Sequence, residues 1–138
     1  MSNTTIRTSG KWILCGEHSV LRGSPALAFP IRSQFFEIEF LKSDKPLSIA
    51  SKTNVDMPHL KPFEAALDRG LSLLKKTRQD LRGTITATAN VTLGAGLGGS
   101  ATLCVTVGRL FVSLGWLQIS EMFSFCRELE NVFHGKSS

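Results

Sequence analysis

The sequence lacks the features that would tie the chain to disulfide bonds, a membrane or nucleic acid. Its 138 residues include only three cysteines, an odd number without the spacing of disulfide frameworks or metal motifs. No basic and then apolar leader opens the chain, and no hydrophobic run is long enough to span a membrane. Lysine and arginine are scattered, with one cluster at Lys75, Lys76 and Arg78. These absences predict a cytoplasmic protein with reduced cysteines and neither nucleic-acid nor membrane partners.

The composition is that of one globular domain covering residues 1–138. Hydrophobic residues make up 42% of the chain and charged residues 20%, which is enough apolar material for a real core. The formal charge of +5 is modest and favours anionic substrates without identifying one.

The most informative stretch of the sequence is a glycine-rich loop. A run of alternating threonine and apolar residues precedes it, and an apolar run follows it. Four of the six residues from 94 to 99 are glycine, although each glycine loses much conformational freedom on folding. Such a run suits backbone that lies against a ligand. Because a helix is expected to follow, the loop N–H groups and the helix dipole would face one anion. The predicted phosphate site comprises Gly94, Ala95, Gly96, Leu97, Gly98, Gly99, Ser100 and Ala101.

Other interpretations of this loop remain to be weighed. A tight strand-to-helix turn would need only one or two glycines. The spacing Gly94-x-Gly96-x-x-Gly99 also fits a dinucleotide fingerprint, but the nearest later acid, Glu121, is expected on an outer helix face. A Walker-type loop is excluded because no Gly-Lys-Ser/Thr follows the glycines. The hydroxyl of Ser100 could cap the helix or bind a metal beside phosphates.

Periodicity predicts a two-layer α/β (α+β) fold with a mixed sheet packed against helices. Glu37 and Glu39 fall on the wet face of a strand, and His59 is expected to be exposed at a helix start. Residues 47–50 are expected to pair with the strand at 36–40, and Ser120 to cap the last helix. The predicted strands are residues 4–8, 11–15, 26–29, 36–40, 47–50 and 84–91. Three helices are predicted: the first opens at prolines 58 and 62 and ends at 74, and the others cover 100–114 and 120–134.

Two further stretches carry candidate functional residues. Glu17, His18 and Ser19 follow an apolar strand headed by Lys11, where α/β proteins often keep functional groups, although a plain turn is the alternative. Glu130 falls near the middle of the apolar stripe of the last helix. A carboxylate there needs a cationic partner, so a metal ion and a salt bridge are equally compatible with its position.

Three stretches together resemble the GHMP kinase superfamily, and most closely its mevalonate kinase family. Residues 10–28 are similar to the opening motif, in which a lysine-headed strand runs into Gly-Glu-His and then Pro-Ala-Leu. The glycine loop is similar to the family's phosphate loop, and Glu130 with residues 134–138 to the start of its Glu-then-His-Gly segment. Three residues depart from this pattern. Thr92 and Ser137 stand where the family has proline, and Gly99 stands where it has the first serine of a pair.

The resemblance implies a kinase that uses ATP and Mg²⁺ to phosphorylate a small-molecule hydroxyl, with mevalonate favoured and homoserine, phosphomevalonate and sugars as neighbouring acceptors. It places Ser100 and Glu130 at the Mg²⁺ ion, Lys11 at the attacking hydroxyl, and Glu17, His18 and Ser19 at the acceptor. It also implies that the chain is an N-terminal half, truncated before a catalytic aspartate and a C-terminal domain. We therefore expect a complementary half or self-association, and a fragment that binds without turnover is the alternative.

Overall fold

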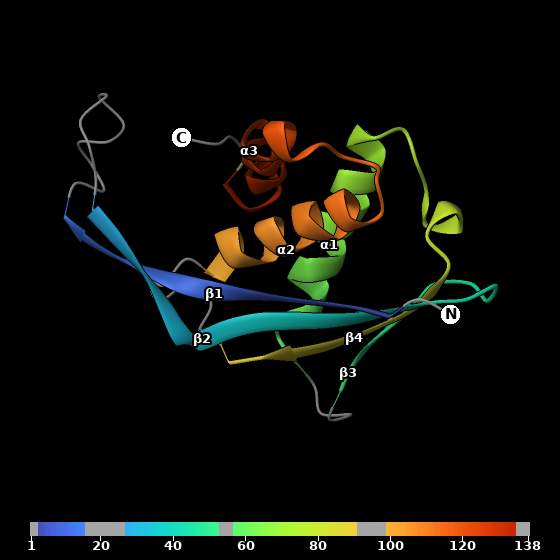
Figure 1. Cartoon of the computed structure of the whole chain (residues 1–138), viewed down its shortest axis with the longest axis horizontal. Coiled ribbons are helices and arrows are strands. Elements are labelled where there is room, and N and C mark those ends of the chain that lie inside the picture. The colour runs from blue at the N-terminus through green and yellow to red at the C-terminus, as the bar shows by residue number, and fades with distance from the viewer. Residues whose placement is uncertain (1–2, 16–26, 53–56, 91–98, 135–138) are drawn as a thin grey trace.

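The computed structural model describes residues 3–15, 27–52, 57–90 and 99–134, with side chains at 3–9, 34–52, 57–90 and 100–131. Within these ranges, four strands form one mixed sheet and three α-helices cover one of its faces (Figure 1). The expected two-layer fold is therefore confirmed.

The sheet has the strand order β1-β2-β4-β3. Its strands are β1 (Asn3–Cys15), β2 (Leu27–Lys42), β3 (Ser48–Ser51) and β4 (Gly83–Ala89). β2 pairs antiparallel with both β1 and β4, whereas β3 pairs parallel with β4. The expected pairing of residues 47–50 with 36–40 is therefore wrong. The longer β4 takes the place beside β2, where the apolar side chain of Ile85 lies in register with Phe40 and extends the core.

The expected break at Ser9 and Gly10 does not end a strand. β1 continues through it, and only its register with β2 shifts between these two residues. An irregularity of this kind bends a strand without stopping its hydrogen bonding. The sequence pattern therefore located the irregularity correctly, but the prediction that the strand ends there is wrong.

Pro30 does not end a strand either, because β2 passes through it. The last pair between β2 and β4 joins Phe36 to Ala89, so β2 has only β1 as a neighbour before that point. Proline is tolerated on such an edge because its missing N–H is not needed there. Residues 26–29 and 36–40, expected as separate strands, thus belong to one long element.

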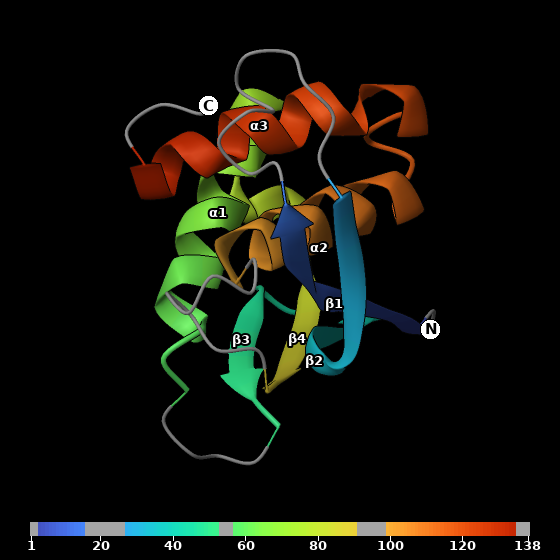
Figure 2. The same cartoon turned by 90° about the vertical axis from the view of Figure 1, so that its left-hand side faces the viewer.

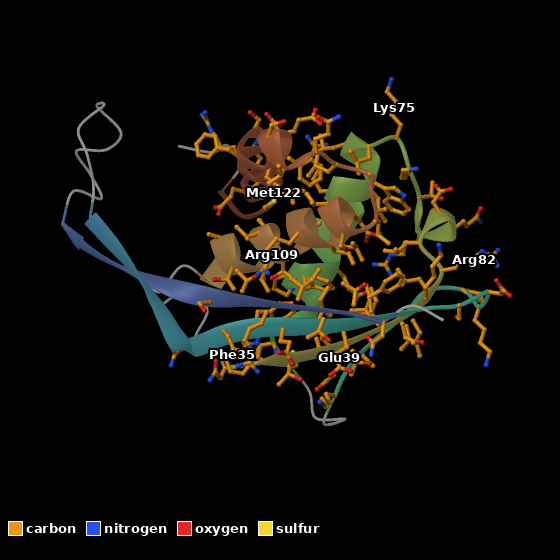
Figure 3. All side chains as sticks on the ribbon, in the orientation of Figure 1. Phe35, Glu39, Lys75, Arg82, Arg109 and Met122 are labelled. Carbon is orange, nitrogen blue, oxygen red and sulfur yellow. The ribbon has the colours of Figure 1, made fainter. Side chains whose placement is uncertain are left out.

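The alternating pattern in β2 is confirmed. Phe36 and Ile38 are fully buried beneath the helices. Glu37 and Glu39 lie on the opposite face, where they pair with Arg7 at 2.8 Å and Lys52 at 3.5 Å (Figure 3). These carboxylates belong to a polar outer face and not to a catalytic pair.

Helix α2 is the central helix of the second layer. The helices are α1 (Leu60–Leu73), α2 (Gly99–Ser113) and α3 (Met122–His134), with 3₁₀ turns η2 (Arg78–Asp80) and η3 (Ile119–Glu121). α2 contacts β1, β2, α1 and α3. Its side chains Leu103, Val107, Leu110 and Phe111 are 0% exposed, as its almost continuous apolar sequence predicts.

His59 is buried, so the expectation that it would be exposed is wrong. It precedes α1 with 9% of its surface exposed, and its ring centroid lies 6.2 Å from that of Phe36. One turn later, Phe63 packs on the same Phe36 ring at 5.2 Å. The start of α1 is thus drawn onto the sheet, and His59 is buried with it.

The start of α3 also differs from expectation. Ser120 lies inside η3 and does not cap α3. Ile119 and Phe123, which the apolar stripe of this helix predicts to be buried, are 72% and 76% exposed. Phe125 is buried in their place, and its ring meets Phe111 of α2 edge-on at 5.8 Å. The buried face of α3 is rotated because the helix packs against both α1 and α2.

Candidate functional site

The structure describes only part of the predicted site. Residues 94–98, Glu17, His18 and Ser19 lie outside the described residues, as do residues 135–138. Lys11 lies within β1, where its backbone pairs with Pro30, and its side chain is not described. Four further members can be placed in full or in part: Gly99, Ser100 and Ala101 at the start of α2, and Glu130 on α3.

The start of α2 has the properties of an anion-binding helix terminus. α2 begins at Gly99, and Ser100 and Ala101 in its first turn are half-buried. No acidic residue occupies this first turn. The first N–H groups of a helix have no partner within it, and the helix dipole adds partial positive charge. A phosphate at the end of the glycine loop would accept hydrogen bonds from these N–H groups and would be attracted by the partial positive charge.

Contacts between α2 and α3 align Glu130 with Ser100. Glycine at position 108, inside the apolar helix expected over 100–114, favours close packing of another element, and a Cβ atom there would lie 3.1 Å from the Sγ atom of Cys126. Cys126 Sγ also lies 3.6 Å from the carbonyl oxygen of Cys104, one turn earlier in α2. Met122, one turn before Cys126, would also lie 3.3 Å from that Cβ atom, so the two helices run in opposite directions (Figure 2). Ser100 lies one turn beyond Cys104 and Glu130 one turn beyond Cys126, toward the same end of the helix pair.

The charge of Glu130 acts on both of these thiols. Burial raises the pKa of the Cys104 thiol, and the negative charges of Glu130 and Cys126 raise it further. Burial and then Glu130 raise the pKa of the Cys126 thiol to about 11. Both cysteines are free, in agreement with the sequence. The carboxylate of Glu130 therefore lies within electrostatic range of both thiols.

Replacing Glu130 by Gln should lower the pKa of Cys126. The negative charge of Glu130 no longer repels the Cys126 thiolate, so the thiolate is more stable and the thiol ionises at lower pH. The pKa should stay above the value of about 8.5 for a free thiol, because burial is the larger cause. The Cβ chemical shift of Cys126 followed against pH measures this change.

Glu128→Gln is the matched control, since Glu128 is exposed on the same helix. Equal Cys126 titration curves in the two variants would contradict the placement of Glu130.

One polar contact between β1 and α2 was not singled out by sequence reasoning. The hydroxyl groups of Thr8 and Thr106 are hydrogen-bonded in the core, and Arg109 lies at the outer edge of this contact (Figure 3). The signal that could have found it is the pair Thr102 and Thr106, four residues apart in an otherwise apolar helix.

Two searches of the described residues gave negative results. Within the described ranges, no three side chains of histidine, cysteine, aspartate or glutamate form a cluster that could hold a metal ion. No described helix combines the length and the apolar character that crossing a membrane requires.

Comparison with known proteins identifies a family of small-molecule kinases. The sequence profile described as the GHMP kinases N terminal domain matches residues 64–138, more than half of the chain. No sequence match was found among curated proteins.

Several solved kinases share the fold. The mevalonate kinase of Methanococcus jannaschii aligns with a TM-score of 0.75 and 21% identity over 99% of this chain. A mevalonate kinase from methicillin-resistant Staphylococcus aureus aligns with a TM-score of 0.69 and 28% identity over 100%. A galactokinase of Lactococcus lactis aligns with a TM-score of 0.74 and 15% identity over 99%. These alignments cover 49%, 48% and 39% of the three kinases, so the chain spans about half the length of the mevalonate kinases.

Proposed function

Since this chain belongs to the GHMP kinase family, we propose that it forms the nucleotide-binding half of an enzyme that transfers the γ-phosphoryl group of ATP to the hydroxyl of a small molecule, with mevalonate as the favoured acceptor. The family membership itself supports the kinase class. The acceptor, the nucleotide and the roles of individual residues are proposals that rest on the site.

The alignment of Ser100 with Glu130 carries the proposal. A hydroxyl at the first turn of α2 and a half-buried carboxylate on α3 lie toward the same end of the antiparallel pair, each one turn beyond the contact between Cys104 and Cys126. Hydroxyl and carboxylate oxygens are the ligand type that Mg²⁺ accepts, usually together with phosphate oxygens and water. The effect of Glu130 on the pKa of both thiols places its carboxylate near Cys104 and Cys126, on the side of α3 that faces α2. These donors fit a Mg²⁺ ion beside a nucleotide.

The remaining residues have roles suited to phosphoryl transfer, which depends mainly on positioning and charge neutralisation. The N–H groups of residues 94–101 would hold the phosphates of ATP. Bound Mg²⁺ supplies positive charge that offsets the charge of those phosphates. Lys11 would place an ammonium group near the acceptor hydroxyl, and Glu17, His18 and Ser19 would bind and orient the acceptor.

Mevalonate is the favoured acceptor for two reasons. The stretch from residue 10 to residue 28 has the residue pattern of the mevalonate kinase opening motif. Among the solved structures compared above, the Staphylococcus aureus mevalonate kinase also has the highest identity, 28%. A phosphomevalonate kinase of Streptococcus pneumoniae at 22% and a homoserine kinase of Cytophaga hutchinsonii at 19% share the fold, so their acceptors are the alternatives to test.

The proposal predicts that catalysis needs a second half, because these 138 residues span about half of a mevalonate kinase. The test measures MgATP binding and mevalonate-dependent ADP release by this chain, alone and with a C-terminal half of such a kinase. We expect binding without steady turnover for the chain alone, self-association or pairing with the added half, and turnover in the mixture. Absence of MgATP binding would contradict the proposal, and an active monomer would contradict the need for a second half.

Gly98→Val should weaken ATP binding by about tenfold or more, because a branched side chain would keep phosphate away from the loop N–H groups. Isothermal titration calorimetry with MgATP measures the affinity. Mevalonate binding provides the internal control, since the proposed acceptor residues lie elsewhere in the sequence. An unchanged ATP affinity would remove the loop from the site.

A further inference from the structure

A chain of buried hydrogen bonds joins β1 to α2. Thr8 Oγ1 and Thr106 Oγ1 lie 2.9 Å apart, and the two residues are 9% and 0% exposed. Thr106 Oγ1 also donates to Thr102 O at 2.8 Å. Arg109 Nη1 donates to Thr8 Oγ1 at 3.2 Å and to Arg7 O at 2.6 Å. We call Thr8, Thr106 and Arg109 the β1–α2 clamp.

The donors and acceptors of the clamp are mutually consistent. A threonine hydroxyl has one proton, and Thr106 gives its proton to a carbonyl oxygen that can only accept. Thr8 therefore donates to Thr106 while it accepts from Arg109. Apolar contacts tolerate small sliding movements, whereas hydrogen bonds weaken steeply with distance and angle. The clamp thus specifies one position of the strand along the helix.

The clamp lies just before β1 leaves the main sheet. The residues of β2 that precede Phe36 are not paired with β4, and Phe36 itself lies opposite Thr8 of β1. From Gly10 onward, β1 and β2 form a two-stranded ribbon that extends past the other strands (Figure 1). Two-stranded ribbons twist more than wide sheets and have little stability of their own. The direction of the ribbon therefore depends on how β1 is anchored at its base.

The ribbon carries Lys11 toward the same end of the molecule at which α2 begins. Figure 1 shows β1 and α2 running in opposite directions, so later residues of β1 approach earlier residues of α2. Residue 11 lies roughly 10 Å along the strand beyond Thr8, at about 3.3 Å per residue. Ser100 lies roughly 9 Å along the helix before Thr106, at about 1.5 Å per residue. Both are thus displaced from the clamp by similar distances.

We propose that the β1–α2 clamp is a positioning device that sets the place of Lys11 relative to the phosphate-binding end of α2. The inference rests on the proposed function, which assigns phosphate to that end and a cationic role to Lys11. Thr8, Thr106 and Arg109 do not touch the reacting groups in this assignment. They act through the backbone of β1.

The test follows the ammonium group of Lys11 in this chain by NMR after reductive ¹³C-methylation, which keeps the lysine charge. Lys11→Arg identifies its signal. A non-hydrolysable MgATP analogue should raise the Lys11 pKa in the wild type, because nearby phosphates favour the ammonium form. In Thr106→Val, this pKa rise should shrink by about twofold or more, since the strand loses its fixed place and the charges move apart. Thr106→Ser should restore the rise.

Arg109→Ala provides a second variant, because Arg109 is exposed and its loss removes two hydrogen bonds to β1 without opening the core. It should also reduce the rise. Ser113→Ala is the matched control, since Ser113 Oγ donates to Leu110 O within α2 and makes no bond to β1. A full rise of the Lys11 pKa in both Thr106→Val and Arg109→Ala would overturn the positioning role of the clamp and leave the proposed function standing. No rise in the wild type would overturn the proposed function together with this inference.

Discussion

Glu130→Gln is expected to weaken Mg²⁺-dependent ATP binding by about tenfold or more, because an amide of the same size cannot supply the charge that a bound Mg²⁺ ion needs. The carboxylate lies toward the Ser100 end of the helix pair, and its charge raises the pKa of the buried Cys104 thiol and of the half-buried Cys126 thiol. The effect should be specific to the metal-dependent part of the affinity. Calorimetric titration of ATP with and without Mg²⁺ separates the two parts.

The matched control for this prediction is Glu128→Gln. Glu128 lies on the same helix, is exposed and pairs with the Asn131 amide at 3.3 Å. Its replacement changes the net charge equally but leaves the Ser100 end of α2 untouched. Equal losses in both variants would show that general electrostatics and not a metal ligand is being measured. No loss in Glu130→Gln would contradict the assigned metal site.

Gly83→Ala is expected to lower the free energy of unfolding by about 3 kcal/mol or more, since it combines backbone strain with a steric clash. Gly83 begins β4 with a φ of 138°, which residues with a side chain rarely adopt. A Cβ atom there would meet the carbonyl oxygen of Leu41 in β2, well inside contact distance. The pairing of β2 and β4 would have to shift to admit it. Urea unfolding followed by circular dichroism gives the loss.

Gly115→Ala separates the two causes of this loss. Gly115 also has a positive φ, 78°, but a Cβ atom there would meet no heavy atom within 4 Å. Its replacement should therefore cost only the backbone strain, about 1–2 kcal/mol. Similar losses at the two positions would show that the contact with Leu41 is unimportant.

Much of the secondary structure could be predicted because the relevant information is local. The alternation in β4 and in residues 36–40 of β2, and the apolar stripe of α1, each reflect one element with one buried face. Gly115 was expected to end α2 and does have positive φ just beyond it. In each case, the period or the residue type already specifies the backbone conformation.

The residue patterns alone predicted the candidate site only as separate pieces. The glycine loop singled out Ser100 and the apolar stripe singled out Glu130, and only the family resemblance joined the two at one metal ion. Their alignment depends on Gly108, which lets α3 approach closely, and on the contact between Cys104 and Cys126. No periodicity within one helix carries the register between two helices.

The sequence by itself determined the three helices, most of the residues that lie in strands, the glycine-rich stretch and the family. Only the tertiary structure decided the order of the strands, the burial of His59, the choice of Phe125 over Phe123 and the clamp between Thr8 and Thr106. The physical reason is that these features depend on contacts between residues far apart in the chain. Local periodicity shows that a face will be buried. Which partner buries it, and in which register, depends on the summed packing and hydrogen bonding of the whole domain.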